Sequence, residues 1–565
     1  MTYARQLYNV KAISQFQTKF ENFEPLVTGV IMKKHLLWPI LLVFMLGTTF
    51  AAPKYGGTLV FGVGGDAVHM DPGAASDGNS INVTSNVYDN LLNFKYGTAI
   101  LEPGLAESYN ISSDGLTYTF KLRKGVKFHK TRFYKKANPF TADDVVFTLK
   151  RQMDSQHPFF NVSSSGKWVY WGAMDMNNMV ESVKKIDTYT VQIKLQQVNV
   201  TFLSNLAMHF VSILSKTYAE DMMKKGNANK IDTYPVGTGP FKFMAHKRDD
   251  RVVLEANEAY WGGKPYLKRL ILRVIPNGSV RAAELQTGAI QVLDFPSPSD
   301  IPILQEDPKF KLPNQEGLNV GYLALNMDKA PFDNVLVRKA MAYGINRQEI
   351  IDAVYEGFGK VAKNPIPPTM PAYNDDIMDF EYNPAKAREL LAEAGYPNGL
   401  SSEIWAMPVA RPYMPNARKV AEKIQADLDK VGIKLKIVSY EWGTYLSKTR
   451  DGEHPMCLLG WTGDNGDPDN FLFNLLGSAA AINKAGNRAF YKSAPFDAQL
   501  KLGQTVADPQ KRIGYYRKAQ EIFHNDVPWV PIAHSIIFQP MYKYVMGYKL
   551  NPLGLRQFKE VWLDK

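Results

Sequence analysis

Apolar and polar residues alternate in several short runs of the chain, which is the pattern of strands with one buried face. Residues 116–122 and 190–195 alternate in this way, and the runs 251–255 and 269–275 are mainly apolar. A further run, residues 57–61, stands before a glycine-rich turn. These runs predict strands, and those after residue 250 suit a mixed sheet.

Two helices are predicted in the first half of the chain. Residues 80–94 favour a helix that leads into a loop. Thr141 and Asp144 have the spacing of a capping box, in which two side chains satisfy backbone groups at the start of a helix. The apolar residues that follow them, up to Leu149, predict a helix there.

The second half of the chain combines helix signals with strand patterns. Asn383 stands before a proline at the start of a predicted helix, and Gly395 follows where that helix must end. Residues 417–431 place apolar side chains on one helical face, and residues 433–437 alternate as a strand after Gly432. Helix-then-strand units of this kind build an α/β domain with a largely parallel sheet.

The N-terminal region has the pattern of an export signal. A short basic stretch begins at Met32, residues 36–50 are almost wholly apolar, and small residues follow. We predict a signal peptide over residues 32–51 that is cleaved after Ala51. The apolar run of about 15 residues is short for a membrane span, which needs about 20, and an uncleaved N-terminal anchor is the alternative. Because a signal normally starts the chain, residues 1–31 are predicted to be a mis-assigned N-terminal extension.

Composition narrows the class of protein and its location. The 565 residues include 66 Lys and Arg against 55 Asp and Glu, a formal net charge of +11, with no block of basic residues. We therefore expect no nucleic-acid partner. The single cysteine, Cys457, is remote from the predicted cleavage site, so we expect neither a lipid anchor nor an intramolecular disulfide. An exported, unanchored chain of this size is expected in the periplasm.

The chain has no residue pattern for catalysis or cofactor binding. Residues 62–67 fit the dinucleotide fingerprint G-x-G-x-x-A after a strand, but Asp71 and Pro72 interrupt before the required helix. The histidines are scattered without metal-ligand spacing, and there is no Walker lysine motif, H-E-x-x-H or G-x-S-x-G. We therefore expect no cofactor, no metal and no enzymatic activity.

Two charged residues follow predicted strands. Asp464 comes after the strand predicted at residues 457–461, at the carboxyl end where α/β sheets bind ligands. The EF-hand spacing for calcium is absent around it, and the neighbouring Asp467 and Asp469 are explained as caps of the next helix. Arg411 also lies between a strand-like run and a helix. A surface arginine held by a proline-rich turn is the alternative interpretation of Arg411.

Several segments resemble one protein family. The segments 404–413, 440–443 and 460–470 are similar to the dipeptide-binding proteins of bacterial ABC peptide importers. Further segments resemble the wider peptide/nickel class of solute-binding proteins, namely 104–108, 114–125, 141–147, 235–241, 260–265 and 317–322. The resemblance covers almost all of the chain after the predicted signal. The Arg-Pro-Tyr and Gly-Asp-Asn-Gly-Asp-Pro-Asp-Asn runs narrow it to the dipeptide branch.

The resemblance implies an α/β fold, that of a two-lobed periplasmic binding protein of type II, cluster C. Two crossover strands would join the lobes, and an extra subdomain would be inserted in the first lobe. The first lobe would hold residues 54–316 and 534–565, and the second lobe residues 317–533. A ligand would be enclosed when the lobes close.

The resemblance also implies roles for residues of this chain. In that family an aspartate pairs with the α-amino group of the peptide and an arginine with its α-carboxylate, and the matching residues are Asp464 and Arg411. The predicted cleft residues around them are Tyr413, Trp442, Trp461 and Gly463, and those of the opposite wall are Ser76, Asp77 and Gly78. A zwitterionic peptide suits such a pair, because its two charges are separated by about 3.3–3.6 Å per residue when extended. An arginine can bond both oxygens of a carboxylate.

The expected function is the capture of dipeptides or short peptides and their delivery to ABC permease subunits that are driven by separate ATPase subunits. We expect a monomer. The chain lacks the disulfides of the better-known dipeptide binders, and an acidic residue, Asp77, lies on the predicted cleft wall. A longer peptide, a basic peptide or a haem-like ligand are therefore alternatives. An exported peptide hydrolase is the alternative from another class, but the chain lacks a nucleophile or metal constellation for it.

Overall fold

β1 (Thr58–Val63) lies at the centre of the first of two seven-stranded sheets in the computed structural model, which describes residues 52–164, 166–482 and 484–565. The predicted signal peptide and N-terminal extension lie outside the described residues. β1 pairs in parallel with a strand on each side, and the outer pairs are antiparallel, so the sheet is mixed as predicted. The spatial order is β12 (Phe310–Lys311), β20 (Met541–Tyr542), β11 (Val292–Leu293), β1, β10 (Arg269–Val274), β9 (Arg251–Ala256) and β8 (Phe241–Lys247).

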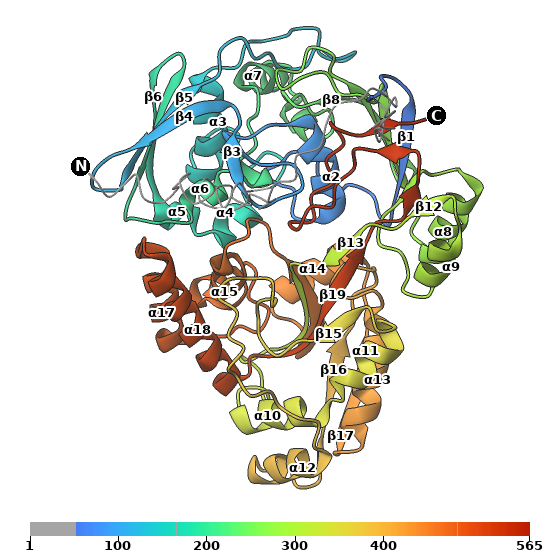
Figure 1. The fold of residues 1–565 in the computed structure, drawn as a ribbon. Coiled ribbons are helices and arrows are strands. Elements are labelled where there is room, and N and C mark those ends of the chain that lie inside the picture. The colour runs from blue at the N-terminus through green and yellow to red at the C-terminus, as the bar shows by residue number, and fades with distance from the viewer. Residues whose placement is uncertain (1–51, 165, 483) are drawn as a thin grey trace, which may run out of the picture. The chain divides into compact units, whose positions relative to one another are not determined.

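A four-stranded antiparallel sheet is inserted between β1 and β8 and forms the extra subdomain of the first lobe, at the upper left of Figure 1. Its order is β4 (Ala106–Ile111), β5 (Thr117–Leu122), β7 (Thr190–Leu195) and β6 (Val180–Asp187). α3 (Ala142–Met153) packs against it and begins with the predicted capping box, in which the Thr141 amide donates to Asp144 Oδ2 at 2.9 Å. The two alternating strands and the capped helix predicted here are confirmed.

The helix predicted at residues 80–94 is shorter than expected. α2 (Gly78–Val87) begins earlier, because Asp77 accepts hydrogen bonds from two amides of the first turn. The chain then leaves the helix, and β2 (Leu92–Phe94) pairs with β3 (Leu101–Pro103). This strand pairing, which local helix propensity cannot report, replaces the last part of the predicted helix.

The second seven-stranded sheet is the centre of the second lobe. β16 is parallel to both β17 and β18, whereas the other pairs are antiparallel. The prediction of a largely parallel sheet is therefore wrong, because β14 and β19 enter antiparallel from distant parts of the chain. The order is β13 (Asn314–Glu316), β19 (Trp529–Phe538), β14 (Asn319–Leu325), β18 (Met456–Thr462), β16 (Leu400–Trp405) and β17 (Ile433–Val438), with β15 (Gly359–Val361) beside β19.

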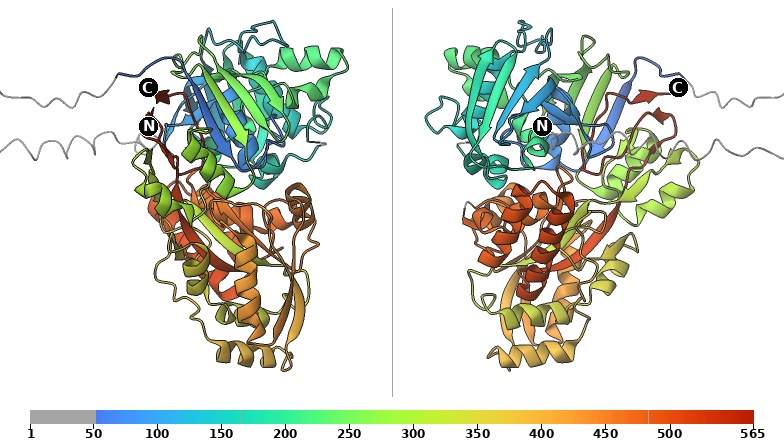
Figure 2. Two further views of the ribbon diagram at one scale, coloured as in Figure 1. Left: turned by 90° about the vertical axis from the view of Figure 1, so that its right-hand side faces the viewer. Right: turned by 60° about the vertical axis from the view of Figure 1, so that its left-hand side comes forward.

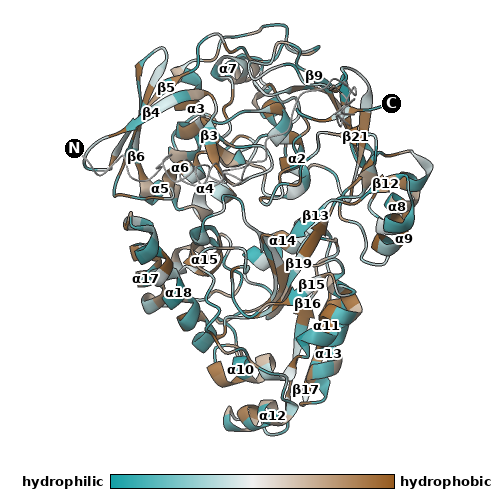
Figure 3. Ribbon diagram, viewed as in Figure 1, coloured by the Kyte–Doolittle hydropathy of each residue, from teal (hydrophilic) through white to brown (hydrophobic). Residues whose placement is uncertain are grey.

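Amphipathic helices cover the second sheet. In α13 (Ala417–Asp429), Asn416 accepts a hydrogen bond from the third amide, and the predicted face is buried through Val420, Ile424 and Leu428. In Figure 3, β19 is mainly hydrophobic, whereas α18 is mainly hydrophilic. The other helices are α10 (Val335–Gly344), α11 (Arg347–Val354), α12 (Pro384–Glu393), α14 (Trp442–Arg450), α15 (Pro468–Leu476), α16 (Ser478–Ile482), α17 (Ala494–Thr505) and α18 (Pro509–Asp526).

The remaining elements belong to the first lobe and are short. They are α4 (Val169–Ala173), α5 (Met176–Met179), α6 (Phe202–Asn205), the 3₁₀ helix η1 (His209–Val211), α7 (Lys216–Lys224), the 3₁₀ helix η2 (Ala228–Asp232), α8 (Gly278–Thr287), α9 (Asp300–Glu306), β21 (Val545–Met546) and β22 (Trp562–Leu563). Within the described ranges, none of the helices combines the length and the apolar character that crossing a membrane requires.

Two adjacent chain segments join the lobes. Lys311 pairs with Met541 in the first sheet, and Asn314 pairs with Phe538 in the second, so the two connections run side by side. Figure 1 and Figure 2 show these segments passing from one lobe to the other. This is the pair of crossover strands that the resemblance implied. The lobe boundaries at residues 316 and 534, which lie inside or next to strands of the second sheet, remain a prediction.

Candidate ligand-binding cavity

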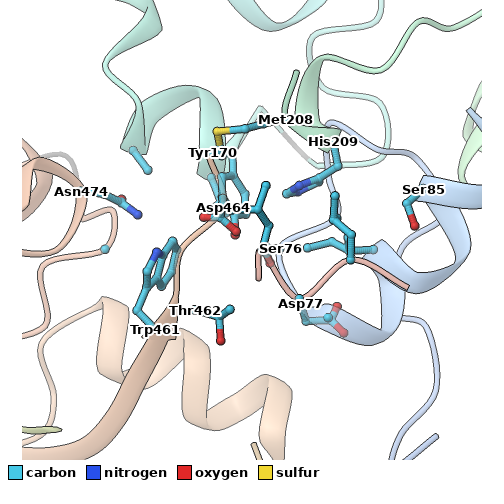
Figure 4. Close-up of a pocket in the computed structure, with 18 of the residues that line it drawn as sticks. Ser76, Asp77, Ser85, Tyr170, Met208, His209, Trp461, Thr462, Asp464 and Asn474 are labelled. Carbon is cyan, nitrogen blue, oxygen red and sulfur yellow. The ribbon is translucent and has the colours of Figure 1, made fainter. Parts of the chain in front are cut away.

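A cavity of about 280 Å³ lies between the two lobes. Figure 4 shows Asp464 and Trp461 of the second lobe close to Tyr170, His209 and Ser76 of the first. All of the predicted site residues except Gly463 line this cavity, namely Ser76, Asp77, Gly78, Arg411, Tyr413, Trp442, Trp461 and Asp464. The structure therefore brings together, at one cavity, predicted site residues from segments that are far apart in the chain.

The parallel pairing of two strands brings Arg411 and Asp464, the residues predicted to bind the two ends of a peptide, to the same cavity. β16 and β18 are parallel, with Trp405 opposite Cys457. The carboxyl ends of the two strands therefore meet at one edge of the sheet. Arg411 follows β16 and Asp464 follows β18, so both reach the cavity from the second lobe.

The Asp464 carboxylate is bound by two neutral hydrogen-bond donors. The hydroxyl of Tyr170 donates to Asp464 Oδ1 at 3.3 Å, and Asn470 Nδ2 donates to Oδ2 at 3.4 Å. No Lys, Arg or His in the described part of the chain forms an ion pair with it. Burial raises the pKa of Asp464 to about 7, and the hydrogen bonds from Asn470 and Tyr170 offset this only in part. A cation in the cavity would stabilise the ionised carboxylate.

Asn470 orients both Asp464 and Trp461, and it was not among the predicted site residues. Its Oδ1 accepts hydrogen bonds from the Asp464 amide at 2.9 Å and from Trp461 Nε1 at 3.0 Å. The side chain is buried, with 2% of its surface exposed. Asn470 closes the acidic segment that begins at Asp464, and this position in the sequence was the signal that could have identified it.

Arg411 is held at the cavity by a tight turn and an aromatic ring. Its amide and carbonyl exchange hydrogen bonds with Met414 at 3.1 and 3.0 Å. The guanidinium carbon lies 4.6 Å from the centroid of the Trp442 ring. Its Nη2 is buried and has no hydrogen-bond partner in the described part of the chain. A guanidinium supported by an aromatic face, with a donor unused, is suited to a carboxylate.

Tyr413 reaches the cavity by packing on two paired glycines. Gly321 of β14 lies opposite Gly460 of β18. A Cβ at Gly460 would lie 2.2 Å from the Tyr413 ring, and one at Gly321 would lie 2.4 Å from the Tyr413 carbonyl oxygen. That carbonyl also accepts a hydrogen bond from the Tyr355 hydroxyl at 2.8 Å. Only glycine leaves room for this close approach.

Of the three residues predicted for the first-lobe wall, two are exposed and the third uses its side chain in hydrogen bonds within its own segment. Ser76 and Gly78 are exposed beside the cavity. The Asp77 carboxylate accepts hydrogen bonds from the amides of Asn79 and Ser80 at 3.0 and 3.2 Å, and from Ser80 Oγ at 2.7 Å. Asp77 thus uses its charge to cap α2, where an anion is favourable.

Tyr170 and His209 complete the first-lobe wall and were not predicted. The two rings meet edge to face at a centroid distance of 4.5 Å, and Tyr170 lies 6.1 Å from the ring of Trp461. Burial lowers the pKa of His209 to about 4, so its imidazole is neutral, and Nε2 bonds to the Ala75 carbonyl at 3.0 Å. These residues contribute an aromatic, uncharged surface opposite Asp464.

Gly463 lies outside the cavity lining and packs against Leu318 and Phe471. Its amide donates to the Leu318 carbonyl at 2.8 Å, and a Cβ there would lie 2.7 Å from the Phe471 ring. It does not line the cavity itself. Its position instead fixes the backbone from which Asp464 projects.

Asp467 and Asp469 have structural partners. Asp467 caps α15 by accepting from the Asp469 amide at 3.0 Å, and it pairs with Arg512 at 2.9 Å. Asp469 is instead buried in the first helical turn and accepts from Gln504 at 3.2 Å. Burial and the nearby Asp467 carboxylate raise the pKa of Asp469 to about 7. The cap prediction is confirmed for Asp467 and wrong for Asp469, whose side chain points into the core.

Two lobes, a pair of connecting strands and an interlobe cavity with charged and aromatic groups define a solute-binding protein. The sequence model described as "Bacterial extracellular solute-binding proteins, family 5 Middle" matches residues 101–483. The chain belongs to family 5 of the bacterial extracellular solute-binding proteins.

Similarity to individual proteins extends beyond these residues to more than nine-tenths of the chain. The dipeptide-binding protein of Escherichia coli is 45% identical over 92% of this chain and 97% of its own length. Heme-binding protein A of Haemophilus influenzae is 44% identical over 91% of this chain and 94% of its own length. The structure of the periplasmic binding protein DppA of Helicobacter pylori, in complex with the peptide STSA, is 42% identical with a TM-score of 0.87, covering 91% of this chain and 99% of that one.

Proposed function

We propose that this protein captures dipeptides and other short peptides as the binding component of an ABC importer. The observation that carries the proposal is a pair of unneutralised groups in one cavity. Asp464 lacks a cationic partner, and Arg411 has a buried donor without an acceptor among the described residues. A zwitterion with an ammonium at one end and a carboxylate at the other would satisfy both.

The chemistry of the two groups sets their roles. Asp464 would bind the α-ammonium group of the peptide, because an adjacent cation offsets the burial of its carboxylate. Arg411 would bind the α-carboxylate through its planar fork, held in place by Trp442. Tyr413 and Trp461 would wall the space between, where water can bridge to variable side chains. The peptide-binding and dipeptide-binding names of relatives support this assignment.

Closure of the two lobes would enclose the ligand. The second lobe supplies both charged groups, while Tyr170, Ser76 and Gly78 come from the first lobe. A ligand held on the second lobe would therefore gain contacts with the first lobe only in the closed form, which shifts the population toward closure.

The class of protein also supports a cellular location and a set of partners for this chain. We place the mature chain in the periplasm, released by cleavage of the signal peptide predicted at residues 32–51. It would work as a monomer and deliver its cargo to permease subunits whose transport is driven by separate ATPase subunits. The family membership and the transporter-associated relative support this role.

Calorimetry with capped peptides tests the end-group assignment. Ala-Ala is compared with N-acetyl-Ala-Ala and with Ala-Ala amide, which each lack one terminal charge. Each cap should weaken binding by about tenfold or more, which is at least ~1.4 kcal/mol. Asp464→Asn and Arg411→Ala should weaken binding of Ala-Ala to a similar extent. N-acetylation should then cost little more in Asp464→Asn, and amidation little more in Arg411→Ala, because each pair of changes removes one contact.

The control variant is Arg418→Ala, which removes an exposed guanidinium on α13. It should keep the response to both caps. Equal binding of capped and free peptides, or wild-type affinity in either site variant, would contradict the assignment. Recovery of intact Ala-Ala after long incubation with the protein would argue against the alternative of a peptide hydrolase.

A haem-like ligand is the second candidate, because a relative named heme-binding protein A is 44% identical. The aromatic walls provided by Tyr170, Trp442 and Trp461 would suit a flat apolar ligand. Titration of haem into protein saturated with Ala-Ala distinguishes the two candidates. Competition for the cavity would support haem binding there, and the absence of any haem signal would leave peptides as the cargo.

A further inference from the structure

One wall of the cavity is basic and is formed by residues other than Asp464 and Arg411, the pair proposed to bind the two ends of the peptide. Arg450 is the last residue of α14, Asn474 lies in α15, and Arg488 lies shortly before α17. All three line the same cavity as Arg411 and Asp464. We call Arg450, Asn474 and Arg488 the basic wall.

Arg488 of the basic wall forms no ion pair with an acidic side chain among the described residues. Its Nη1 donates to the Ala485 carbonyl, while its Nε is buried without a hydrogen-bond partner among the described residues. Its backbone is fixed, because the carbonyl oxygen is 2.8 Å from Nε2 of the buried His454. Burial lowers the pKa of Arg488. Arg488 is half-buried and forms no ion pair in the described part of the chain, so an anion in the cavity would stabilise its guanidinium.

Asn474 provides a second unused donor. Both its Nδ2 and its Oδ1 are buried and lack hydrogen-bond partners in the described ranges. Figure 4 shows the amide directed toward the cavity from the side of Trp461. A Cβ at Gly486 would lie 2.7 Å from Asn474 Oδ1, so the glycine allows the loop that leads to Arg488 to press against this amide. A buried amide with no partner indicates a ligand or water contact.

The acid beside the basic wall, Asp451, pairs with Arg450 but not with Arg488. Asp451 Oδ1 is 3.9 Å from Arg450 Nε and 3.8 Å from Lys484 Nζ, and 43% of its side chain is exposed. Arg450 also donates from Nη2 to Ser447 Oγ at 2.9 Å. Asp451 thus pairs with Arg450 of the basic wall and with Lys484 outside it, and it forms no ion pair with Arg488.

We propose that the basic wall binds the side-chain carboxylate of an acidic residue in the peptide, with Arg488 as the main donor and Asn474 as the second. This inference rests on the proposed function, since it requires a peptide held by Asp464 and Arg411. A planar guanidinium matches a carboxylate and can bond both of its oxygens. The protein would therefore prefer peptides that contain Glu or Asp over their neutral counterparts.

Calorimetry with matched peptide pairs tests the preference. The peptides are Glu-Ala with Gln-Ala, and Ala-Glu with Ala-Gln, so each pair differs in charge but hardly in shape. In the wild-type protein, Glu should bind about tenfold or more tightly than Gln at one of the two positions. Arg488→Met should abolish this ratio, whereas Arg418→Met, which removes an exposed charge on α13, should retain it.

The wild-type comparison decides the matter even if Arg488→Met does not fold. Equal affinity for Glu and Gln peptides at both positions would overturn the inference. An unchanged ratio in folded Arg488→Met would overturn it as well. Ala-Ala serves as the reference: if Ala-Ala binds and no acidic preference appears, only this inference fails. If Ala-Ala does not bind at all, the proposed function fails, and the inference falls with it.

Discussion

The hydroxyl of Tyr170, on the first lobe, donates a hydrogen bond to Oδ1 of Asp464, on the second lobe, at 3.3 Å. The next residue, Asn465, extends the contact between the lobes, because its Nδ2 donates to Asn205 Oδ1 at 2.9 Å. The acid proposed to bind the ligand ammonium is therefore also a point where the lobes meet. If Asp464 binds the ligand as proposed, its protonation state would affect both ligand binding and this contact between the lobes.

We predict that affinity for a dipeptide falls as the pH drops below 7. Burial raises the pKa of Asp464 to about 7, and an α-amino group stays protonated in this range because its pKa is about 7.7–8. Below pH 7 the free protein holds a proton on Asp464 that ammonium binding must expel, so Kd should rise toward tenfold per pH unit. Calorimetry of Ala-Ala between pH 5 and pH 8, in buffers with different ionisation enthalpies, measures both the affinity and the released proton.

Asp464→Asn is the control for this titration, since it should bind weakly at every pH with a flat profile. A wild-type affinity that is constant between pH 5 and pH 8 would contradict the role of Asp464.

Tyr170→Phe should move the midpoint of the same affinity-against-pH profile to higher pH. The Tyr170 hydroxyl lowers the pKa of Asp464 through its hydrogen bond, so its removal leaves less ionised carboxylate at pH 7. The variant should bind Ala-Ala a few-fold more weakly at pH 7 and approach wild type at higher pH. Tyr515→Phe, on α18 and outside the cavity, should leave the profile in place. An unshifted midpoint in Tyr170→Phe would show that the hydroxyl does not influence Asp464.

The features that could be predicted from the sequence are those set by residues close together in the chain. The apolar face of α13 and the cap of α12 follow from local spacing, and both are present. Local spacing placed Asp464 and Arg411 each after a strand, whereas their assignment to one site came from the family resemblance; in the structure both line one cavity because β16 and β18 are parallel. The helix face and the cap need no knowledge of how distant segments meet.

Long-range pairing accounts for most of what sequence reasoning missed. Tyr170 and Asp464 are 294 positions apart, and no local pattern marks a tyrosine for such a contact. The antiparallel entry of β14 and β19 depends on tertiary pairing and not on the helix-then-strand pattern. Asn474 and Arg488 escaped notice because what distinguishes them is the absence of partners in the described structure, which appears only once the fold is known.

Asp464→Asn should stabilise the unliganded protein at pH 8 and leave its stability unchanged near pH 4. The folded-state pKa of about 7 lies above the unfolded value near 3.9, so ionising the folded carboxyl is destabilising. This cost is absent below about pH 3.9, grows between pH 4 and pH 7, and is complete above pH 7. Thermal unfolding at both pH values measures it. A lower midpoint for the variant at pH 8 would contradict the prediction.

Asn470→Ala should weaken dipeptide binding by about tenfold or more, through loss of orientation of Asp464 and Trp461. Its hydrogen bonds to both residues are buried, and leaving such partners unsatisfied costs about 1–3 kcal/mol. Because Asn470 lowers the pKa of Asp464, the midpoint of the pH profile should also move upward. Calorimetry across pH tests both effects. Reduced stability with an unchanged profile would make Asn470 a structural residue only.

Gly460→Ala should reduce both stability and dipeptide affinity, because the new Cβ would lie 2.2 Å from the Tyr413 ring and 2.5 Å from the Val320 carbonyl oxygen. Overpacking of this kind typically costs about 1–3 kcal/mol, and here it would push Tyr413 into the cavity. Gly514→Ala is the matched control. It lies within α18 and has open space where a Cβ would stand, so alanine should stabilise the helix by up to about 1 kcal/mol. Urea unfolding and calorimetry of Ala-Ala separate the two variants, and equal behaviour of both would show that the glycine pair under Tyr413 does not shape the site.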